Sequence, residues 1–290
     1  MPIETANSIS PALLLSIYCA LVMLASLAGG WLLLAVHLNH TRLQLAVSLV
    51  AGLMLGIALL HFLPDAEEQI HSMDRTMQWV LGGFLVMFFV QRFFHFHHHD
   101  LPEGDPEDCC EHDHGHHHEH DHTKTLADKS AKQLSWVGTA LGLTLHSLLD
   151  GLALAAAVAA GAAAGHTKIA GLGVALVVIL HKPFDAMAVS TLMTAGGKSK
   201  FSRHVLNGLF ALASPLGAAL FYFDVNQLAG THGALLGYSL AFCAGSFLCI
   251  ASSDLLPELQ FHSHDRFKLS IALLAGLSIA YLIGLLEGMQ

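Results

Sequence analysis

The sequence has 290 residues, of which 54% are hydrophobic and only 12% are charged, and its formal net charge is −9. A soluble domain usually carries about 25% charged residues, so this composition excludes an ordinary soluble protein and indicates a membrane protein. An acidic chain attracts cations rather than nucleic acid, and we expect no nucleic-acid partner.

The chain is predicted to cross a lipid bilayer eight times. Apolar stretches near the ~20 residues needed for one crossing recur along its whole length. They cover approximately residues 11–36, 43–63, 79–94, 136–164, 169–195, 205–223, 234–256 and 269–286. A membrane-crossing segment must satisfy its own backbone hydrogen bonds, and the short alternating strands of a membrane barrel are absent from the sequence. We therefore predict an all-α integral membrane protein with eight transmembrane helices.

The positive residues predict which side each loop faces. Eight crossings place both termini on the same side of the membrane. If that side is outside, the outer loops contain only Arg75 and Lys168, and the remaining loop lysines and arginines lie inside. This distribution follows the positive-inside rule, so we expect extracytoplasmic termini. We expect a plasma membrane, and the short termini favour a bacterial inner membrane.

One long polar loop, residues 95–134, separates predicted helices one to three (residues 1–94) from helices four to eight (residues 135–290). The loop is predicted to be cytoplasmic, and its composition cannot bury a core, so we expect disorder without a ligand. Histidine-rich tracts are typical of metal-binding segments, whereas a purification tag is usually a terminal run of histidines alone. The candidate loop ligands are His112, His114, His116, His117, His118, His120, His122, Cys109 and Cys110.

Two stretches at predicted helix ends are similar to each other. Residues 61–65 read HFLPD and residues 254–258 read DLLPE. The second predicted helix runs outward and the seventh inward, so the two matching ends face opposite sides. This arrangement is typical of the inverted repeats of transporters, although five similar positions also arise by chance.

The fourth and fifth predicted helices each carry the pattern His-x-x-x-Asp, formed by His146 and Asp150 and again by His181 and Asp185. Residues four apart lie on one helix face, and an Asp at the centre of a membrane helix costs about 2.5–3.5 kcal/mol, so these side chains should face the protein interior. Two imidazoles and two carboxylates suit a borderline divalent cation such as Zn²⁺. The alternative is that each His only hydrogen-bonds its own Asp and holds the helices in place.

Lys182 and Pro183 follow His181 directly, in the middle of the fifth predicted helix. Pro183 lacks the N–H of a helical residue and clashes with the carbonyl of Ile179, so we expect a kink beside the site. Lys182 lies far from both membrane interfaces, so its ammonium has little chance to reach water as a snorkelling lysine does.

These features together resemble the ZIP (Zrt/Irt-like) family of metal-ion transporters. The resemblance is carried by HSLLDG and HKPFDA, by the eight predicted spans with an outer N-terminus, by the histidine-rich loop, and by GSFLCIASSDLLPEL in the seventh helix. It implies a ZIP-like bundle around helices four and five that imports Zn²⁺ and related divalent ions into the cytoplasm by an elevator-type movement. It also implies a homodimer in the lipid bilayer, with no catalytic cofactor.

The resemblance assigns the primary metal site to the two His-x-x-x-Asp pairs, where many family members have Glu in place of each Asp. Members that bind two metals have Asn, Asp and Glu at the second metal position. Here these positions are Ser147, Lys182 and Ser214. We therefore predict a site for one metal ion, in which the ammonium of Lys182 takes the place of the second cation.

Polar residues on both sides suggest a path for the ion. The candidate outer-path residues are His61, Asp65, Glu67 and Glu68. The candidate inner-path residues are Asp254, Glu258, His262 and His264. The alternative for each is an ordinary solvated helix end.

Two other functions fit part of the pattern. A metal exporter of the cation-diffusion type also uses intramembrane His and Asp ligands, but it would have fewer spans and a soluble C-terminal domain. An intramembrane zinc hydrolase would need three protein ligands and an open water position, whereas this sequence offers four ligands and no His-Glu-x-x-His. We therefore expect a transporter and not an enzyme. The same ligand set also serves Cd²⁺, Fe²⁺, Mn²⁺ and Co²⁺.

Overall fold

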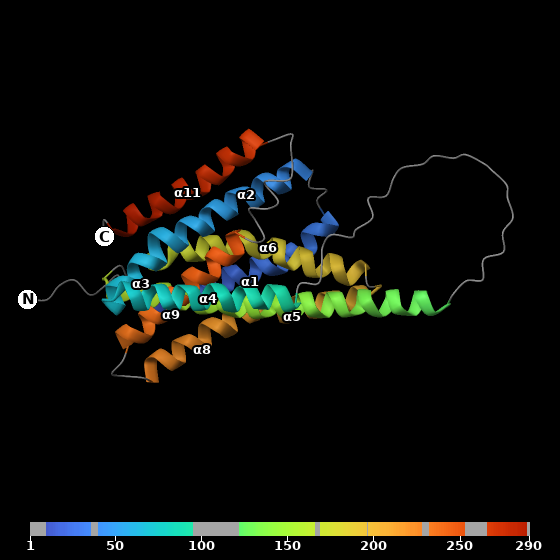
Figure 1. The fold of residues 1–290 in the computed structure, drawn as a ribbon, viewed down its shortest axis with the longest axis horizontal. Coiled ribbons are helices and arrows are strands. Elements are labelled where there is room, and N and C mark those ends of the chain that lie inside the picture. Colours follow the sequence, from blue (N-terminus) through green and yellow to red (C-terminus); the bar gives the residue numbers. More distant parts are fainter. Residues whose placement is uncertain are drawn as a thin grey trace, which may run out of the picture.

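The computed structural model describes residues 10–35, 40–94, 122–165, 169–195, 197–227, 232–252 and 266–288. Within these ranges every regular element is helical, and the helices lie roughly along one common axis (Figure 1). The elements are α1 (Pro11–Ala35), α2 (His40–Ile57), the π-helical turn η1 (Ala58–Phe62), α3 (Leu63–Ile70), α4 (Met73–Phe94), α5 (His122–Ala163), α6 (Leu172–Ala195), α7 (Lys200–Ala211), α8 (Ala213–Gln227), α9 (His232–Ile250) and α11 (Arg266–Gly288).

In the described part of the chain, 6 helical segments are long and apolar enough to cross a membrane. They are Pro11–Gly30, Thr41–Ile70, Ala140–Ala163, Leu172–Thr191, Lys200–Phe223 and Arg266–Leu286. Each falls on one of the predicted spans, so the all-α membrane fold is confirmed. The two remaining predicted spans fall on α4 and on α9, whose apolar part Ala234–Ile250 is shorter. The total of eight crossings stays a prediction.

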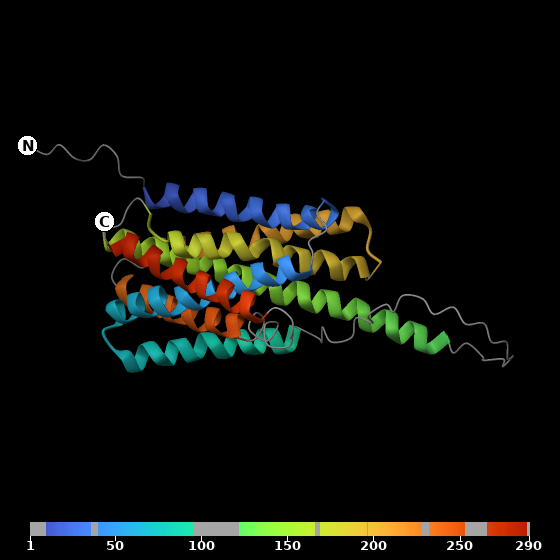
Figure 2. The same ribbon diagram turned by 90° about the horizontal axis from the view of Figure 1, so that it is seen from above.

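The beginning of α1 and the end of α11 lie at the same end of the bundle (Figure 2). This is what an even number of crossings requires. Which end of the bundle faces outside stays a prediction from the charge distribution.

The helices pack in two groups. The α5–α6 group consists of α1, α5, α6, α7 and α8, with the closest packing between α5 and α8 and between α1 and α6. The α2–α9 group consists of α2, η1, α3, α4, α9 and α11, with the closest packing between α2 and α11 and between α4 and α9. The groups meet mainly where α5 contacts α4 and α9 and where α6 contacts α2.

Glycines bring the most tightly packed helices into backbone contact. A Cβ added at Gly151 on α5 would collide with the carbonyl of Ser214 on α8, and a Cβ at Gly217 on α8 would collide with the carbonyl of Leu148 on α5. Small residues of this kind are typical of membrane helices, because apolar burial gives no extra drive for helices to associate in lipid. They hold α5 at a fixed distance from α8.

Two prolines shape the helices that surround the site. At η1 the N–H of Leu63 bonds to the carbonyl of Ala58, five residues back, directly before Pro64. Pro215 similarly follows the break between α7 and α8, since its ring would clash with the carbonyl of Ala211 in an uninterrupted helix. The predicted helices 43–63 and 205–223 are therefore each interrupted, which their apolar patterns did not indicate. In contrast, α6 continues as one helix through Pro183.

The helix α5 is 42 residues long and begins at His122. Residues 122–134, which we predicted as the end of a disordered loop, are therefore helical and continuous with the fourth predicted span. In both views α5 extends beyond the other helices at one end of the bundle (Figures 1 and 2). Residues 95–121 of the predicted loop lie outside the described residues.

Candidate metal centre

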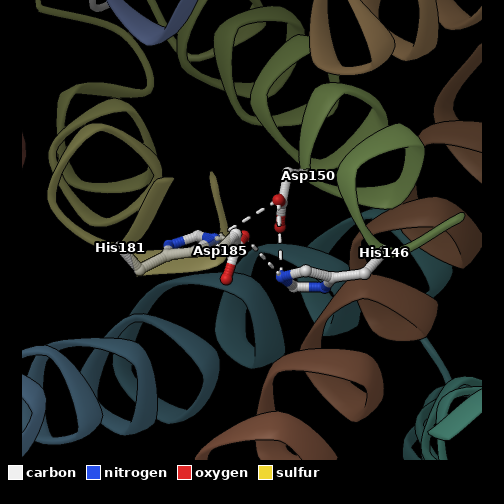
Figure 3. A group of neighbouring side chains, drawn as sticks. All are labelled: His146, Asp150, His181 and Asp185. Carbon is white, nitrogen blue, oxygen red and sulfur yellow. Dashed lines mark hydrogen bonds and ion pairs between the residues drawn. The ribbon is translucent and has the colours of Figure 1, made fainter. Parts of the chain in front are cut away.

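The two His-x-x-x-Asp pairs face one another across the contact between α5 and α6 (Figure 3). His146 and Asp150 project from α5, and His181 and Asp185 project from α6. One ligand atom from each side chain lies within 4.8 Å of the other three. The prediction that these residues come together is confirmed.

The four nitrogen–oxygen distances in the centre are close to those between the ligands of a tetrahedral divalent cation. The Nε2 atom of His146 lies 3.6 Å from Oδ2 of Asp150 and 3.7 Å from Oδ2 of Asp185. The Nε2 atom of His181 lies 3.3 Å and 3.7 Å from the same two oxygens. Zn²⁺ bound to nitrogen and oxygen at about 2.1 Å places neighbouring ligands about 3.4 Å apart. Only small side-chain movements would therefore be needed to hold the ion.

The hydrogen bond of His181 to its own helix prepares its ring for a metal. Its Nδ1 atom donates to the carbonyl of Val177 at 2.9 Å, which directs Nε2 toward the carboxylates, where it donates to Oδ2 of Asp150 at 3.3 Å. A metal ion bound there would replace the proton on Nε2. His181 also lies closer to Asp150 on the other helix than to Asp185 on its own helix. The alternative of a separate His–Asp pair within each helix therefore does not describe this arrangement.

The ligands are shielded from their surroundings. Asp150 is fully buried and both histidines are 5% exposed, while the Asp185 side chain retains 18% of its exposure. Buried carboxylates require a compensating cation, because an unpaired buried charge is strongly unfavourable. The Oδ1 atom of Asp150 has no hydrogen-bond partner among the described residues. The centre is thus suited to hold positive charge.

Lys182 supplies a positive charge inside this centre. Its side chain is fully buried, and its ammonium donates to the Asp150 carboxylate and, at 2.9 Å, to the hydroxyl of Ser147. It lies 3.6 Å from Asp185 and 5.6 Å from the centre of the Phe210 ring. A cation near an aromatic face is attracted to it. The alternative of a snorkelling lysine is therefore wrong.

Ser147 and Lys182, two of the three residues at the expected second metal position, thus contact each other directly. The third, Ser214, is buried, and its hydroxyl has no hydrogen-bond partner within the described part of the chain. The Phe210 contact was missed by sequence reasoning. Phe210 lies four residues before Ser214, but no local pattern indicates which helix its ring will face.

Three of the four outer-path residues line one cavity of about 330 Å³: His61, Asp65 and Glu68 do, whereas Glu67 is not among its lining residues. The opposite wall includes Ala157 and Val174. Ala157 lies seven residues after Asp150, and Val174 lies seven residues before His181. Seven residues correspond to about 10 Å along a helix and return to the same helix face. His61 is 8% exposed, and its Nε2 donates to the carbonyl of Ala280 at 2.9 Å. The cavity therefore lies two helical turns from the centre.

Several predicted residues lie outside the described residues. They are the inner-path residues Asp254, Glu258, His262 and His264, together with the loop residues Cys109, Cys110, His112, His114, His116, His117, His118 and His120. The DLLPE half of the proposed repeat also lies there. The remaining loop candidate, His122, is the first residue of α5.

Comparisons with known proteins identify the family of the chain. The family model described as "ZIP Zinc transporter" matches residues 13–284. The chain is 28% identical over 293 residues to "Zinc transporter ZIP9-B" of Xenopus laevis, covering 85% of this chain and 87% of that protein. It is also 28% identical over 291 residues to "Zinc transporter ZIP9" of Xenopus tropicalis, covering 84% and 86%. The resemblance seen in the sequence is confirmed.

Proposed function

The chain belongs to the ZIP family of zinc transporters, and we propose that it carries Zn²⁺ into the cytoplasm through a single metal site formed by the two His-x-x-x-Asp pairs. Members of the family are transporters, so the alternative of a zinc hydrolase is excluded. Zn²⁺ is the substrate of the process and not a resident cofactor.

The observation that carries this proposal is the convergence of four nitrogen and oxygen ligand atoms within 4.8 Å of one another, between two apolar helices. Such a ligand set accepts Zn²⁺ first and Cd²⁺, Fe²⁺, Mn²⁺ or Co²⁺ as competitors. Two ionised carboxylates balance the charge of a divalent ion, but the ammonium of Lys182 already offsets part of their negative charge. This weakens the hold on the ion and supports release and rebinding rather than permanent retention.

Lys182 supports the assignment of one ion rather than two. Its ammonium lies against Asp150 and Ser147 and so occupies the place beside the carboxylate where a second divalent ion would have to bind. Coulombic repulsion between this ammonium and a second cation a few ångströms away is unfavourable at any interior dielectric constant. The lysine then neutralises part of the acidic charge when no metal is bound.

The two packing groups support an elevator-type movement. Both metal-binding helices belong to the α5–α6 group, whereas His61, Asp65 and Glu68 belong to the α2–α9 group. The outer cavity is lined by residues from both groups and so lies at their boundary. Displacement of one group relative to the other would open or close this cavity without rebuilding the metal site.

The remaining parts of the proposal concern assembly and orientation. We propose a homodimer with extracytoplasmic termini in a plasma membrane, on the basis of the family and of the charge distribution. The two relatives come from frogs, so they do not add support for a bacterial inner membrane. A cation-diffusion exporter is the second candidate on ligand chemistry alone, but the family match does not favour it.

Zinc flux into proteoliposomes tests the proposal. Wild-type protein should accumulate labelled Zn²⁺, and His181→Ala should lose most of this flux. His71→Asn is a matched control, because His71 is an exposed histidine with a positive φ of 52°, which asparagine tolerates. Equal flux in wild type and His181→Ala would contradict the assigned site. Zinc movement from the predicted cytoplasmic side to the side of the termini would favour an exporter.

A further inference from the structure

A second cavity, of about 220 Å³, lies between α1, α6 and α7. It is lined by Gly30, Ser190, Thr191, Thr194, Lys200, Arg203, His204 and Asn207. Its α6 residues begin five positions after Asp185, toward the end of the bundle that we predict to be cytoplasmic. None of the lining residues is acidic, and three of them carry basic side chains. The cavity is therefore unsuited to a divalent cation and suited to an anion.

The basic residues reach the cavity from the first two turns of α7. Lys200, Arg203, His204 and Asn207 are spaced so that they share one face of this helix. Ser199 caps the helix, since its hydroxyl oxygen accepts the N–H of Ser202 at 3.2 Å. The N-terminal end of a helix carries partial positive charge, which adds to the charge of the basic side chains.

Arg203 is already positioned for an anion. One terminal nitrogen of its guanidinium donates to the hydroxyl of Thr194 on α6 at 2.5 Å. Its Nε atom is buried and has no hydrogen-bond partner among the described residues. Lys200 and His204 are exposed, and neither has an acidic partner in the described part of the chain. The positive charge of this cavity is therefore not compensated there.

Asn207 forms a buried polar wall of the cavity. Its side chain is 7% exposed, and its amide oxygen has no hydrogen-bond partner within the described residues. The amide packs against Gly30 of α1, where any Cβ would collide with it. The NH₂ group of this amide is a donor from which an anion can accept a hydrogen bond. A buried oxygen without a partner is costly, and a ligand that carries a hydroxyl group, such as a protonated phosphate, could donate to it.

We propose that this cavity binds the phosphate group of a phosphate-containing anion, which is either a lipid headgroup or dissolved phosphate. Phosphate oxygens accept hydrogen bonds from donors such as the Arg203 guanidinium, which is held by Thr194, the exposed Lys200 ammonium and the N-terminus of α7. The volume accommodates a tetrahedral oxyanion and one attached group. The bound anion would join α1, α6 and α7 within the α5–α6 group, so it would stabilise the group that carries the metal site.

Thermal unfolding of the purified full chain in detergent tests this proposal without metal. The unfolding temperature is measured in a chelator with inorganic phosphate, with phosphatidylglycerol or with phosphatidylcholine, each against chloride at equal ionic strength. We expect a rise in Tm with phosphate or with the anionic lipid. The arm that produces the rise identifies the source of the phosphate group.

Three variants complete the test. Arg203→Gln should lower the affinity for the stabilising anion about tenfold, because losing a charge-assisted hydrogen bond usually has this effect. If Arg203→Gln does not fold, Lys200→Gln removes an exposed charge from the same cavity and should also weaken binding. Arg266→Gln removes an exposed arginine outside the cavity and should not. The proposal is wrong if no anion raises the Tm of wild type, or if the shift persists in both cavity variants.

Discussion

The ammonium of Lys182 lies against the carboxylate of Asp150, which is also one of the four candidate metal ligands. The lysine ammonium, which stays in the site, and the metal ion, which is exchanged, would therefore interact with the same carboxylate. Without metal, Lys182 stabilises the buried acids. With metal, its charge opposes the ion, so the site would bind zinc less tightly than four ligands alone.

Lys182→Met should separate these two effects. In chelator, the variant should lose about 3–5 kcal/mol of stability, because a buried carboxylate loses its partner. In Zn²⁺ it should recover most of this loss, and the rise in Tm on adding zinc should exceed that of wild type. Lys200→Met, on the exposed start of α7, should leave this rise unchanged. An equal zinc-induced rise in wild type and Lys182→Met would contradict the opposing role of the lysine.

The number of intramembrane ions is a separate prediction. Crystals of wild type soaked in Cd²⁺ should show one anomalous peak between α5 and α6. The double variant Ser147→Asn, Lys182→Asp restores two ligand types of a two-metal centre and should show two peaks. Two peaks in wild type, or a single peak in the double variant, would contradict the substitution of a cation by Lys182.

The contact between α5 and α8 should be sensitive to a single methyl group. In Gly151→Ala the new Cβ meets the Ser214 carbonyl, so we expect a loss of about 1–3 kcal/mol and reduced zinc flux. Gly208→Ala is the matched control, since a Cβ at Gly208 meets no atom within 4 Å. Alanine favours a helix over glycine, so this control should be neutral or stabilising. Equal Tm values for the two variants would show that the close approach is not required.

The cavity lined by His61, Asp65 and Glu68 should raise the local concentration of cations. Glu68→Gln should increase the KM for Zn²⁺ uptake several-fold at low ionic strength with little change in maximal rate, because long-range attraction affects encounter more than transfer. Glu67→Gln removes the same charge one residue away, outside the cavity lining. Uptake kinetics at low and high salt would check this. A similar increase in KM for both variants would assign the effect to general surface charge.

Local periodicity was sufficient to predict that the four side chains of the candidate metal centre come together. The i, i+4 spacing of two His–Asp pairs places each pair on one face, and the cost of exposing them to lipid requires those faces to meet. The position of Lys182 beside Asp150 and Ser147, and of Phe210 beneath its ammonium, depends on the distances and rotations of α5, α6 and α7 relative to one another. Contacts between helices, such as Gly29 of α1 with Pro183 of α6, set that geometry, and no pattern within one helix reports it. The cavity at Asn207 was missed for the same reason.

The boundary between the two helix groups provides the last prediction. Gly173 of α6 and Ile57 of α2 belong to different groups, and a Cβ at Gly173 would lie 2.6 Å from Cδ1 of Ile57. In a background without native cysteines, oxidation of Gly173→Cys, Ile57→Cys should link the groups and stop zinc uptake until a reductant is added. Gly161→Cys, Ala170→Cys links positions within the α5–α6 group, where a Cβ at Gly161 would lie 2.8 Å from that of Ala170. This control should keep its uptake after oxidation, because its link does not cross the boundary. Full uptake by the oxidised Gly173→Cys, Ile57→Cys variant would mean that the groups do not need to move past each other at this point.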